Sequence, residues 1–290
     1  MGSWRALYRA APFLMTLSCA RLLGPPSFAS SPRANESSSG STNLLRVATF
    51  NISGASNLGR LAELVAASSE MRNVDVLMVQ ELASGVSTQD LENLGAGLGL
   101  PFAHTAERHV GAPSLALSSR FPLRDLEILY LPRFDLGYRS RRRIAIAGSV
   151  ELGGESVRLY NVHLDTRIRL SDRIRQLAPV VEGALSSPRA IVGGDVNTIR
   201  SVPVTLPWLP LPLPGFSQAR GLDDHMKSRS FTAPLESVSW TGPLRMRLDA
   251  LFARGLEPGD RGAVVFPGFS DHVALWLDLS LDSAVLEGAR

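Results

Sequence analysis

Asparagine, aspartate, glutamate and histidine residues recur at the borders of apolar stretches along this sequence. Burying ionisable groups beside apolar segments costs desolvation free energy, unless the groups bind one another or a cation. The repeated placement therefore indicates one shared polar site rather than separate surface positions. The residues are Asn51, Glu81, Asn161, His163, Asp195, Asn197, Asp249, Asp271 and His272.

These residue types suit the hydrolysis of a phosphoester by a metal-activated water. The carboxylates of Glu81 and Asp271 are hard oxygen ligands, which favour Mg²⁺ or Mn²⁺ over zinc. His163 and His272 can move protons near neutral pH, and asparagine amides contact phosphate oxygens without adding negative charge. Cys19 is the single cysteine, so the chain forms neither an intrachain disulfide nor a thiolate zinc site.

The spacing of two pairs predicts how they project. Asp195 and Asn197 follow the apolar run 190–194, and Asn161 and His163 end the run 155–164. Residues i and i+2 of a strand face the same side of a sheet, so each pair is expected to point one way. The two glycines before Asp195 let backbone or substrate approach closely. The alternative is a strand followed by a simple Asp/Asn turn.

The elements that must position these residues are mostly strands. Apolar runs predict strands at 45–50, 74–80, 114–119, 126–130, 143–152, 155–164, 190–194, 248–253 and 273–279. Helical spacing predicts helices at 57–69, from Ser87 with a capping box, and from Ser171 with a kink or restart at Pro179. Many strands, few helices and hairpin connections favour an α+β fold of two packed sheets with helices outside.

Short motifs follow one another along the folded part of the chain, from residue 45 to residue 277. They are Thr49–Asn51, Val79–Glu81, Tyr160–Asp165, Gly194–Thr198, Arg247–Asp249 and Ser270–His272. Together they make the chain resemble the endonuclease/exonuclease/phosphatase superfamily, which includes pancreatic-type deoxyribonuclease, neutral sphingomyelinases and inositol polyphosphate phosphatases. The His163-Leu164 pair is more similar to the deoxyribonuclease and sphingomyelinase branches.

This resemblance implies a four-layered α/β/β/α sandwich of two mostly antiparallel sheets flanked by helices, with the site at one end. It implies that Glu81 binds the divalent metal and that Asp271 helps with the same or a second ion. His272 would be the general base, oriented by Asp249, and His163 would protonate the leaving group or stabilise the phosphorane. The base role is left open between His272 and the position of Asp195.

The resemblance further implies that Asp195, Asn51 and Asn197 position phosphate and water. We also assign Asn161 and Arg143 to substrate binding; the alternative for Asn161 is a structural amide at a strand end. Arg143 belongs to one of two arginine clusters that together would form a cationic funnel for phosphates, or else a solvated charged face. The clusters are Arg139, Arg141, Arg142 and Arg143, and Arg167, Arg169, Arg173 and Arg175.

The first residues predict export. Arg5 and Arg9 precede an apolar stretch, and Ser27-Phe28-Ala29 suits cleavage. We therefore divide the chain into an export signal (1–29), a Ser-rich linker (30–43), one domain (44–282) and a tail (283–290). The protein is expected to be periplasmic or secreted; the alternatives are a lipid anchor at Cys19 and a disordered cytosolic tail. Residues beyond 43 carry 26 basic and 26 acidic side chains, so overall basicity does not indicate nucleic-acid binding.

The expected activity is a divalent-metal-dependent phosphoesterase that cleaves phosphodiester bonds, with nucleic acid as the leading substrate. The alternatives are a phospholipid head-group phosphodiesterase of sphingomyelinase type, an inositol-phosphate-type phosphatase, and a non-catalytic binding module of the same fold. The Pro- and Leu-rich stretch 202–216, with Trp208, would be a packed loop, a membrane contact or a wall of the substrate groove. We expect a monomer.

Overall fold

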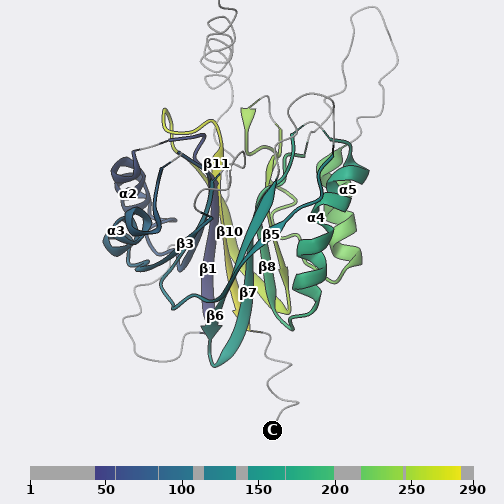
Figure 1. Ribbon diagram of the computed structural model, residues 1–290, viewed down its shortest axis with the longest axis horizontal. Helices are drawn as coiled ribbons and strands as arrows, with labels where there is room; N and C mark the ends of the chain where they lie inside the picture. The colour runs from purple at the N-terminus through teal and green to yellow at the C-terminus, as the bar shows by residue number, and fades with distance from the viewer. Residues whose placement is uncertain are drawn as a thin grey trace, which may run out of the picture.

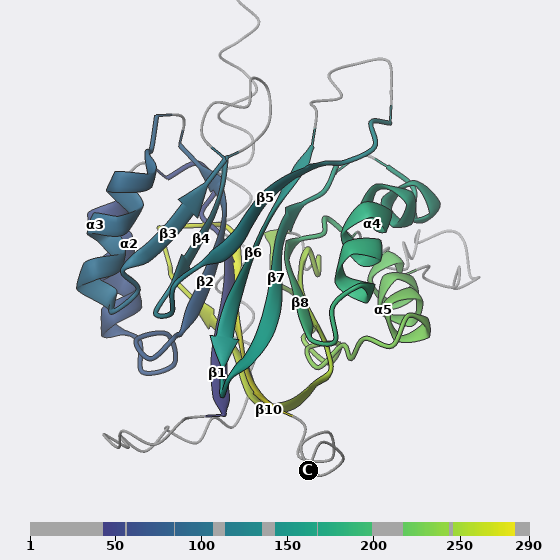
Figure 2. The same ribbon diagram turned by 60° about the horizontal axis from the view of Figure 1, so that its bottom comes forward.

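The computed structural model describes residues 43–55, 57–83, 85–106, 114–134, 143–166, 168–198, 217–243 and 246–281. The predicted export signal, residues 30–42 of the predicted linker, the stretch 202–216 and the predicted tail lie outside these residues. Within them, two sheets stack face to face between two pairs of helices, as Figures 1 and 2 show. The predicted four-layered sandwich is thus confirmed.

One sheet has the strand order β10-β11-β1-β2-β4-β3, and the other has the order β5-β6-β7-β8-β9. Only the β1–β2 and β7–β8 neighbours are parallel, so the sheets are mostly antiparallel, as predicted. The strands of the first sheet are β1 (Leu44–Asn51), β2 (Val76–Leu82), β3 (Phe102–Thr105), β4 (Ser114–Ser119), β10 (Leu256–Val265) and β11 (Val273–Leu281). Those of the second are β5 (Arg124–Tyr130), β6 (Ile144–Leu152), β7 (Glu155–His163), β8 (Ala190–Asp195) and β9 (Asp249–Arg254).

Central strands read as continuous apolar runs because both of their faces are buried. In β11, Leu275 and Leu277 face the core between the sheets, whereas Ala274 and Trp276 face the core beneath the helices. A third core lies between the second sheet and its own helices. Helices α2 (Leu58–Ala67) and α3 (Thr88–Leu98) cover the first sheet, and α4 (Leu170–Leu185) and α5 (Gln218–Ser228) cover the second.

The helix starts follow local capping chemistry, with one correction. Asn57 accepts a hydrogen bond from the Arg60 amide at the start of α2, and Ser87 forms the predicted capping box. The predicted cap at Ser171 is wrong, because α4 begins at Leu170 after Arg169, which makes no side-chain cap bond. The helix continues through Pro179 to Leu185. No helix within the described part of the chain is long and apolar enough to cross a membrane.

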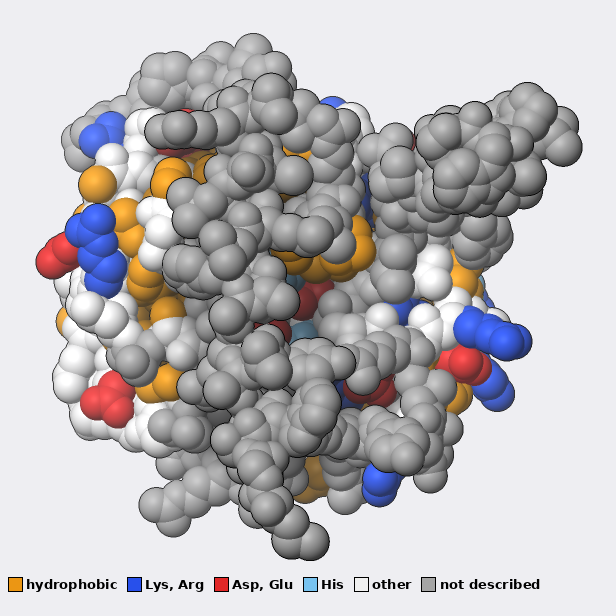
Figure 3. Space-filling view, turned by 90° about the horizontal axis from the view of Figure 1, so that it is seen from above, with side chains coloured by type: hydrophobic (Ala, Val, Ile, Leu, Met, Phe, Trp, Pro, Cys, Tyr) orange, Lys and Arg blue, Asp and Glu red, His pale blue; other side chains and the backbone are white. Residues whose placement is uncertain are grey.

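The directions of the strands bring distant segments to one end of the sandwich. The parallel pairs β1–β2 and β7–β8 end at Asn51, Leu82, His163 and Asp195. Strand β9 runs antiparallel to β8, so that Asp249 at its start lies opposite Asp195. Viewed from this end, acidic and histidine side chains lie recessed at the centre of the molecule (Figure 3).

Candidate active site

A β-bulge at Glu81 aims this carboxylate at the gap between the sheets. Strict alternation along β2 would turn Glu81 away from Gln80, toward the helices. The register with β4 shifts between Gln80 and Leu82, and Glu81 has a φ of 57°. As a result, Gln80 and Glu81 both contact residues of the second sheet, while Leu82 returns to the core under the helices. A non-glycine residue with positive φ is costly and is often found at functional sites.

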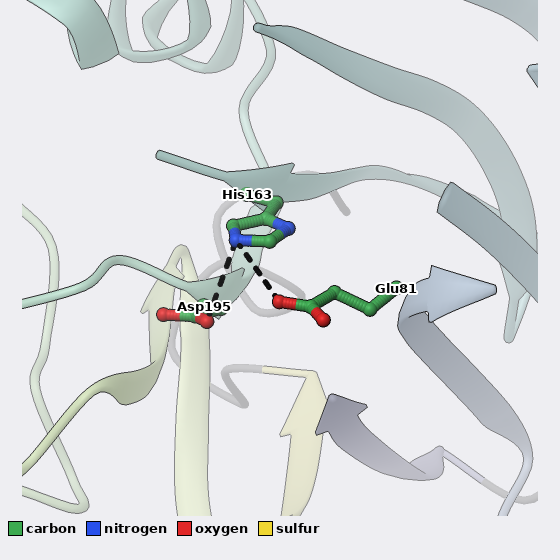
Figure 4. Close-up of side chains that lie close together, drawn as sticks. All are labelled: Glu81, His163 and Asp195. Carbon is green, nitrogen blue, oxygen red and sulfur yellow. Dashed lines mark ion pairs between the residues drawn. The ribbon is translucent and has the colours of Figure 1, made fainter. Parts of the chain in front are cut away.

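The carboxylates of Glu81 and Asp195 converge on His163 (Figure 4), and both also contact Asn51. Nε2 of His163 lies 3.7 Å from Oε1 of Glu81 and 3.6 Å from Oδ2 of Asp195. Asn51 Nδ2 donates to the same two oxygens, at 3.2 and 2.8 Å. Asn51, His163 and Asp195 are buried, whereas the Glu81 side chain is 38% exposed. Glu81 therefore forms the open side of the cluster.

His272 and Asp249 form a second pair next to Asp195. Nδ1 of His272 lies 2.8 Å from Oδ2 of Asp249, and its Nε2 lies 3.9 Å from Oδ2 of Asp195. The Ser270 hydroxyl accepts from the His272 amide and donates to the carbonyl of Asn51. This serine thus ties the start of β11 to the end of β1.

The two histidines have opposite charge preferences. Burial lowers the pKa of His163 well below its ordinary value, and the nearby charges of Arg143 and His272 add to this effect. Burial also lowers the pKa of His272, but Asp249, Asp195 and Asp271 outweigh it and raise this pKa to about 10. His163 is therefore neutral at pH 7, and His272 is protonated.

The ionised form of Asp195 is destabilised by its surroundings, so a neighbouring positive charge would stabilise it. Burial and the neighbouring Asp249 raise its pKa to about 7, against the opposing effects of His272 and Asn51. Glu81, His163 and Asp195 can bring one ligand atom each within 4.8 Å of one another, and so can Asp195, Asp249 and His272. Within the part of the chain that the structure describes, Oδ1 of Asp249 is buried without a hydrogen-bond partner. This oxygen-rich donor set fits a hard divalent cation.

Comparison with known families agrees with this geometry. The model of the Endonuclease/Exonuclease/phosphatase family matches residues 48–272. The chain belongs to this family. As a member of it, the protein is a phosphoester hydrolase, and the predicted resemblance is confirmed. No relative was found among the curated proteins.

Several solved structures of this family and related proteins share the fold. An endonuclease/exonuclease/phosphatase protein from Beutenbergia cavernae is 21% identical, with a TM-score of 0.64 over 83% of this chain and 72% of that one. The human Nocturnin catalytic domain is 20% identical, with a TM-score of 0.57 over 82% and 94%. A humanized D. rerio TDP2 is 16% identical, with a TM-score of 0.58 over 82% and 100%. These likenesses show the fold.

Three of the predicted site residues of this family member lie beside the cluster rather than in it. Asn197 comes after the end of β8 with a φ of 51°, and its amides bond to Asp195 Oδ1 and the Leu164 carbonyl. It does not extend the strand as expected. Asn161 is fully buried and bonded to protein groups. Asp271 is exposed and contributes to neither group of candidate ligands among the described residues. Their predicted roles stay predictions.

Arg143 is held by residues that the sequence did not single out for the site. Its Nε donates to Asp165, which also accepts from Gln176. Its Nη1 is buried and has no hydrogen-bond partner among the described residues. Arg173 is fully buried and donates to the carbonyls of Asp165, Ile168 and Val196.

The arrangement differs from the predicted funnel of surface arginines. Arg143 and Arg173 are buried, and Arg175 pairs with Asp172 on the outside of α4. Arg173 and Gln176 share one face of the helix at i, i+3 spacing, a signal that could have indicated a buried polar contact. Arg139, Arg141, Arg142 and Arg167 lie outside the described residues.

Proposed function

We propose that the chain is a Mg²⁺- or Mn²⁺-dependent phosphodiesterase whose cation is held by Glu81 and Asp195. The observation that carries the proposal is the convergence of these two carboxylates on Asn51 and His163, with no cationic side chain of the described residues between them. His163 is neutral, so it does not balance them. Two acidic groups so close to each other are stabilised by a bound cation.

In this proposal, Glu81 and Asp195 hold the cation and Asn51 fixes both carboxylates. The bound cation supplies Lewis acidity, which neutralises charge developing on the phosphoryl oxygens. His163 keeps a proton on Nε2, the nitrogen that faces the carboxylates, and donates a hydrogen bond from it to a phosphoryl oxygen. The buried Nη1 of Arg143 supports an additional role in binding the phosphate.

The proposed proton acceptor is Nε2 of His272. Asp249 holds the ring through Nδ1, which fixes its orientation and favours the state in which Nε2 takes up a proton. A cation held next to Asp195 would lower the pKa of His272 and so favour a free Nε2. Asp195 then stays ionised and orients the attacking water.

The proposed substrate is a phosphodiester, with nucleic acid leading and a phospholipid head group as the alternative. The equal numbers of acidic and basic residues beyond residue 43 favour a substrate contacted through few phosphates over tight general binding of DNA. We also propose export, which rests on the sequence pattern of residues 1–29.

The test is hydrolysis of bis(p-nitrophenyl) phosphate by the full chain, with Mg²⁺ or with a chelator. We expect activity only with the metal, and a fall in kcat/KM of about 10³-fold in His272→Ala, because a general base contributes 10²- to 10⁴-fold. His225→Gln on α5 is the matched control and should keep wild-type activity. Chelator-resistant hydrolysis, or a fully active His272→Ala variant, would overturn the proposal. Plasmid DNA and sphingomyelin vesicles, compared over a range of salt, then rank the substrates.

A further inference from the structure

Asn161 and Gln80 form a polar connection between the two sheets, directly beneath the cluster. Asn161 lies on β7 two residues before His163, and Gln80 lies on β2 next to Glu81. Gln80 Nε2 donates to Asn161 Oδ1 at 2.7 Å. Both side chains are fully buried, and the core around them is apolar.

The side-chain amide of Asn161 is hydrogen-bonded to β2, which contains the bulge, and to β4, which pairs with β2. Its Nδ2 donates to the carbonyl of Val79 at 2.9 Å and to that of Ala116 at 2.8 Å. Val79 and Ala116 are register partners in β2 and β4, two residues before the bulge at Glu81. All the hydrogen-bonding groups of this amide are thus used within the protein.

The bulge needs such support because it is strained. Glu81 keeps a positive φ that non-glycine residues seldom adopt, and such conformations persist where the surroundings over-determine them. On the β1 side, the amides of Ile52 and Gly54 donate to the carbonyls of Gln80 and Glu81. On the β4 side the ladder shifts register, and there Asn161 supplies the hydrogen bonds to the strand pair.

We propose that the Asn161–Gln80 pair is a positioning device that holds the bulge in register and so aims Glu81 at His163 and Asp195. The inference rests on the proposed function in taking Glu81 as a metal ligand. It assigns Asn161 to the support of the site instead of to substrate. Partners outside the ligand set commonly change metal affinity 10- to 100-fold when they are mutated.

The first arm of the test needs no metal. Amide hydrogen exchange is measured by NMR on the full chain in the presence of chelator, for the variants Asn161→Leu and Gln80→Met. Gln80→Met is the milder change, because Asn161 keeps all but one of its hydrogen bonds. Exchange at Ile52 and Gly54 should rise about tenfold or more in Asn161→Leu, and less in Gln80→Met. Ile146→Val is the matched control, because Ile146 is the cross-strand neighbour of Asn161 in the same core.

The second arm measures Mn²⁺ affinity by electron paramagnetic resonance of the free ion. Asn161→Leu should bind Mn²⁺ about 10- to 100-fold more weakly, while Ile146→Val stays at the wild-type value. Asn161→Leu should also have a lower kcat at low metal. Part of this kcat should return at saturating metal, which simple unfolding would not produce.

The two arms separate the inference from the proposed function. Unchanged exchange at Ile52 and Gly54 in both variants overturns the inference, whatever the metal does. Weaker Mn²⁺ binding in Glu81→Gln together with wild-type binding in Asn161→Leu also overturns it. A third outcome is raised exchange in Asn161→Leu together with wild-type Mn²⁺ binding in Glu81→Gln. It would confirm that Asn161 holds the bulge, but it would refute Glu81 as a metal ligand.

Discussion

His163 and His272 occupy nearly equivalent positions on either side of Asp195. Both rings are buried, and both direct Nε2 toward the same carboxylate oxygen, at 3.6 and 3.9 Å. The pKa of His163 is nevertheless lowered, whereas that of His272 is raised to about 10. Burial lowers both values, so burial does not explain the difference.

The difference lies at the other nitrogen of each ring. Nδ1 of His272 meets the Asp249 carboxylate at 2.8 Å, but Nδ1 of His163 is buried and finds no hydrogen-bond partner in the described residues. Arg143 adds positive charge near His163 and reinforces its neutral state. Two identical residues in one cluster thus differ in charge, neutral and protonated, because the second nitrogen of His272 meets a carboxylate and that of His163 does not.

Of the charges around His272, the Asp249 carboxylate raises its pKa most, so removing it should weaken this contrast most. In Asp249→Asn, we expect kcat/KM to fall about 100-fold, because the base loses its orientation and its charge partner. The carboxylate raises the pKa of His272, so its loss lowers that pKa. The base is active when deprotonated, and the acidic limb of the pH profile of kcat/KM should therefore move to lower pH.

The matched comparison is Asp223→Asn, which removes a buried aspartate that pairs with Arg247 away from the cluster. We expect that variant to lose stability, because Arg247 keeps a buried charge without its partner, but its pH profile should not move. If the acidic limb did not move in Asp249→Asn, His272 would not be the group whose titration limits the activity.

The two histidines should also affect stability in opposite pH ranges. The lowered pKa of His163 means that its contribution is present above about pH 6.5 and is lost as the pH falls below it. The raised pKa of His272 means that its contribution is complete below about pH 6.5 and is lost as the pH rises toward 10. Each effect reaches about 1.4 kcal/mol per pH unit, a tenfold change in the folding constant.

Urea unfolding of the metal-free protein at acid and alkaline pH checks this prediction. Relative to wild type, His163→Gln should lose less stability on acidification, and His272→Gln should lose less on alkalinisation. If His272→Gln instead lost less stability than wild type on acidification, as His163→Gln does, the two rings would not differ in charge.

The sequence predicted the central strands and singled out most of the side chains that meet in the cluster, because both leave a local signal. Apolar runs such as 273–279 end at chemically distinctive residues, and the motifs occur in the family's order. The edge strand β10 was missed, since Pro258 and its neighbouring glycines interrupt the pattern and its register shifts there. Helix α5 was missed because its residues, including Asp223 and Asp224, are mostly polar.

The supports of the site were harder to predict, since they depend on contacts between distant segments. Nothing near Glu81 in the sequence indicates a bulge, because the residue with positive φ is not a glycine. Arg173 resembled part of a solvated helix face, yet it is buried against the carbonyls of two loops. The sequence shows which charged residues a helix carries, but tertiary contacts decide which of these residues are buried.

Asp271 offers the smallest test of the contrast between the histidines. It is exposed and is the last of the charges that raise the pKa of His272, and solvent screens such a charge. We expect Asp271→Asn to lower kcat/KM by less than about tenfold, with a smaller shift of the acidic limb than in Asp249→Asn. Mn²⁺ titration of the activity provides the second measurement. A loss as large as that of Asp249→Asn, accompanied by weaker Mn²⁺ binding, would instead identify Asp271 as a metal ligand and place a cation between it and Asp195.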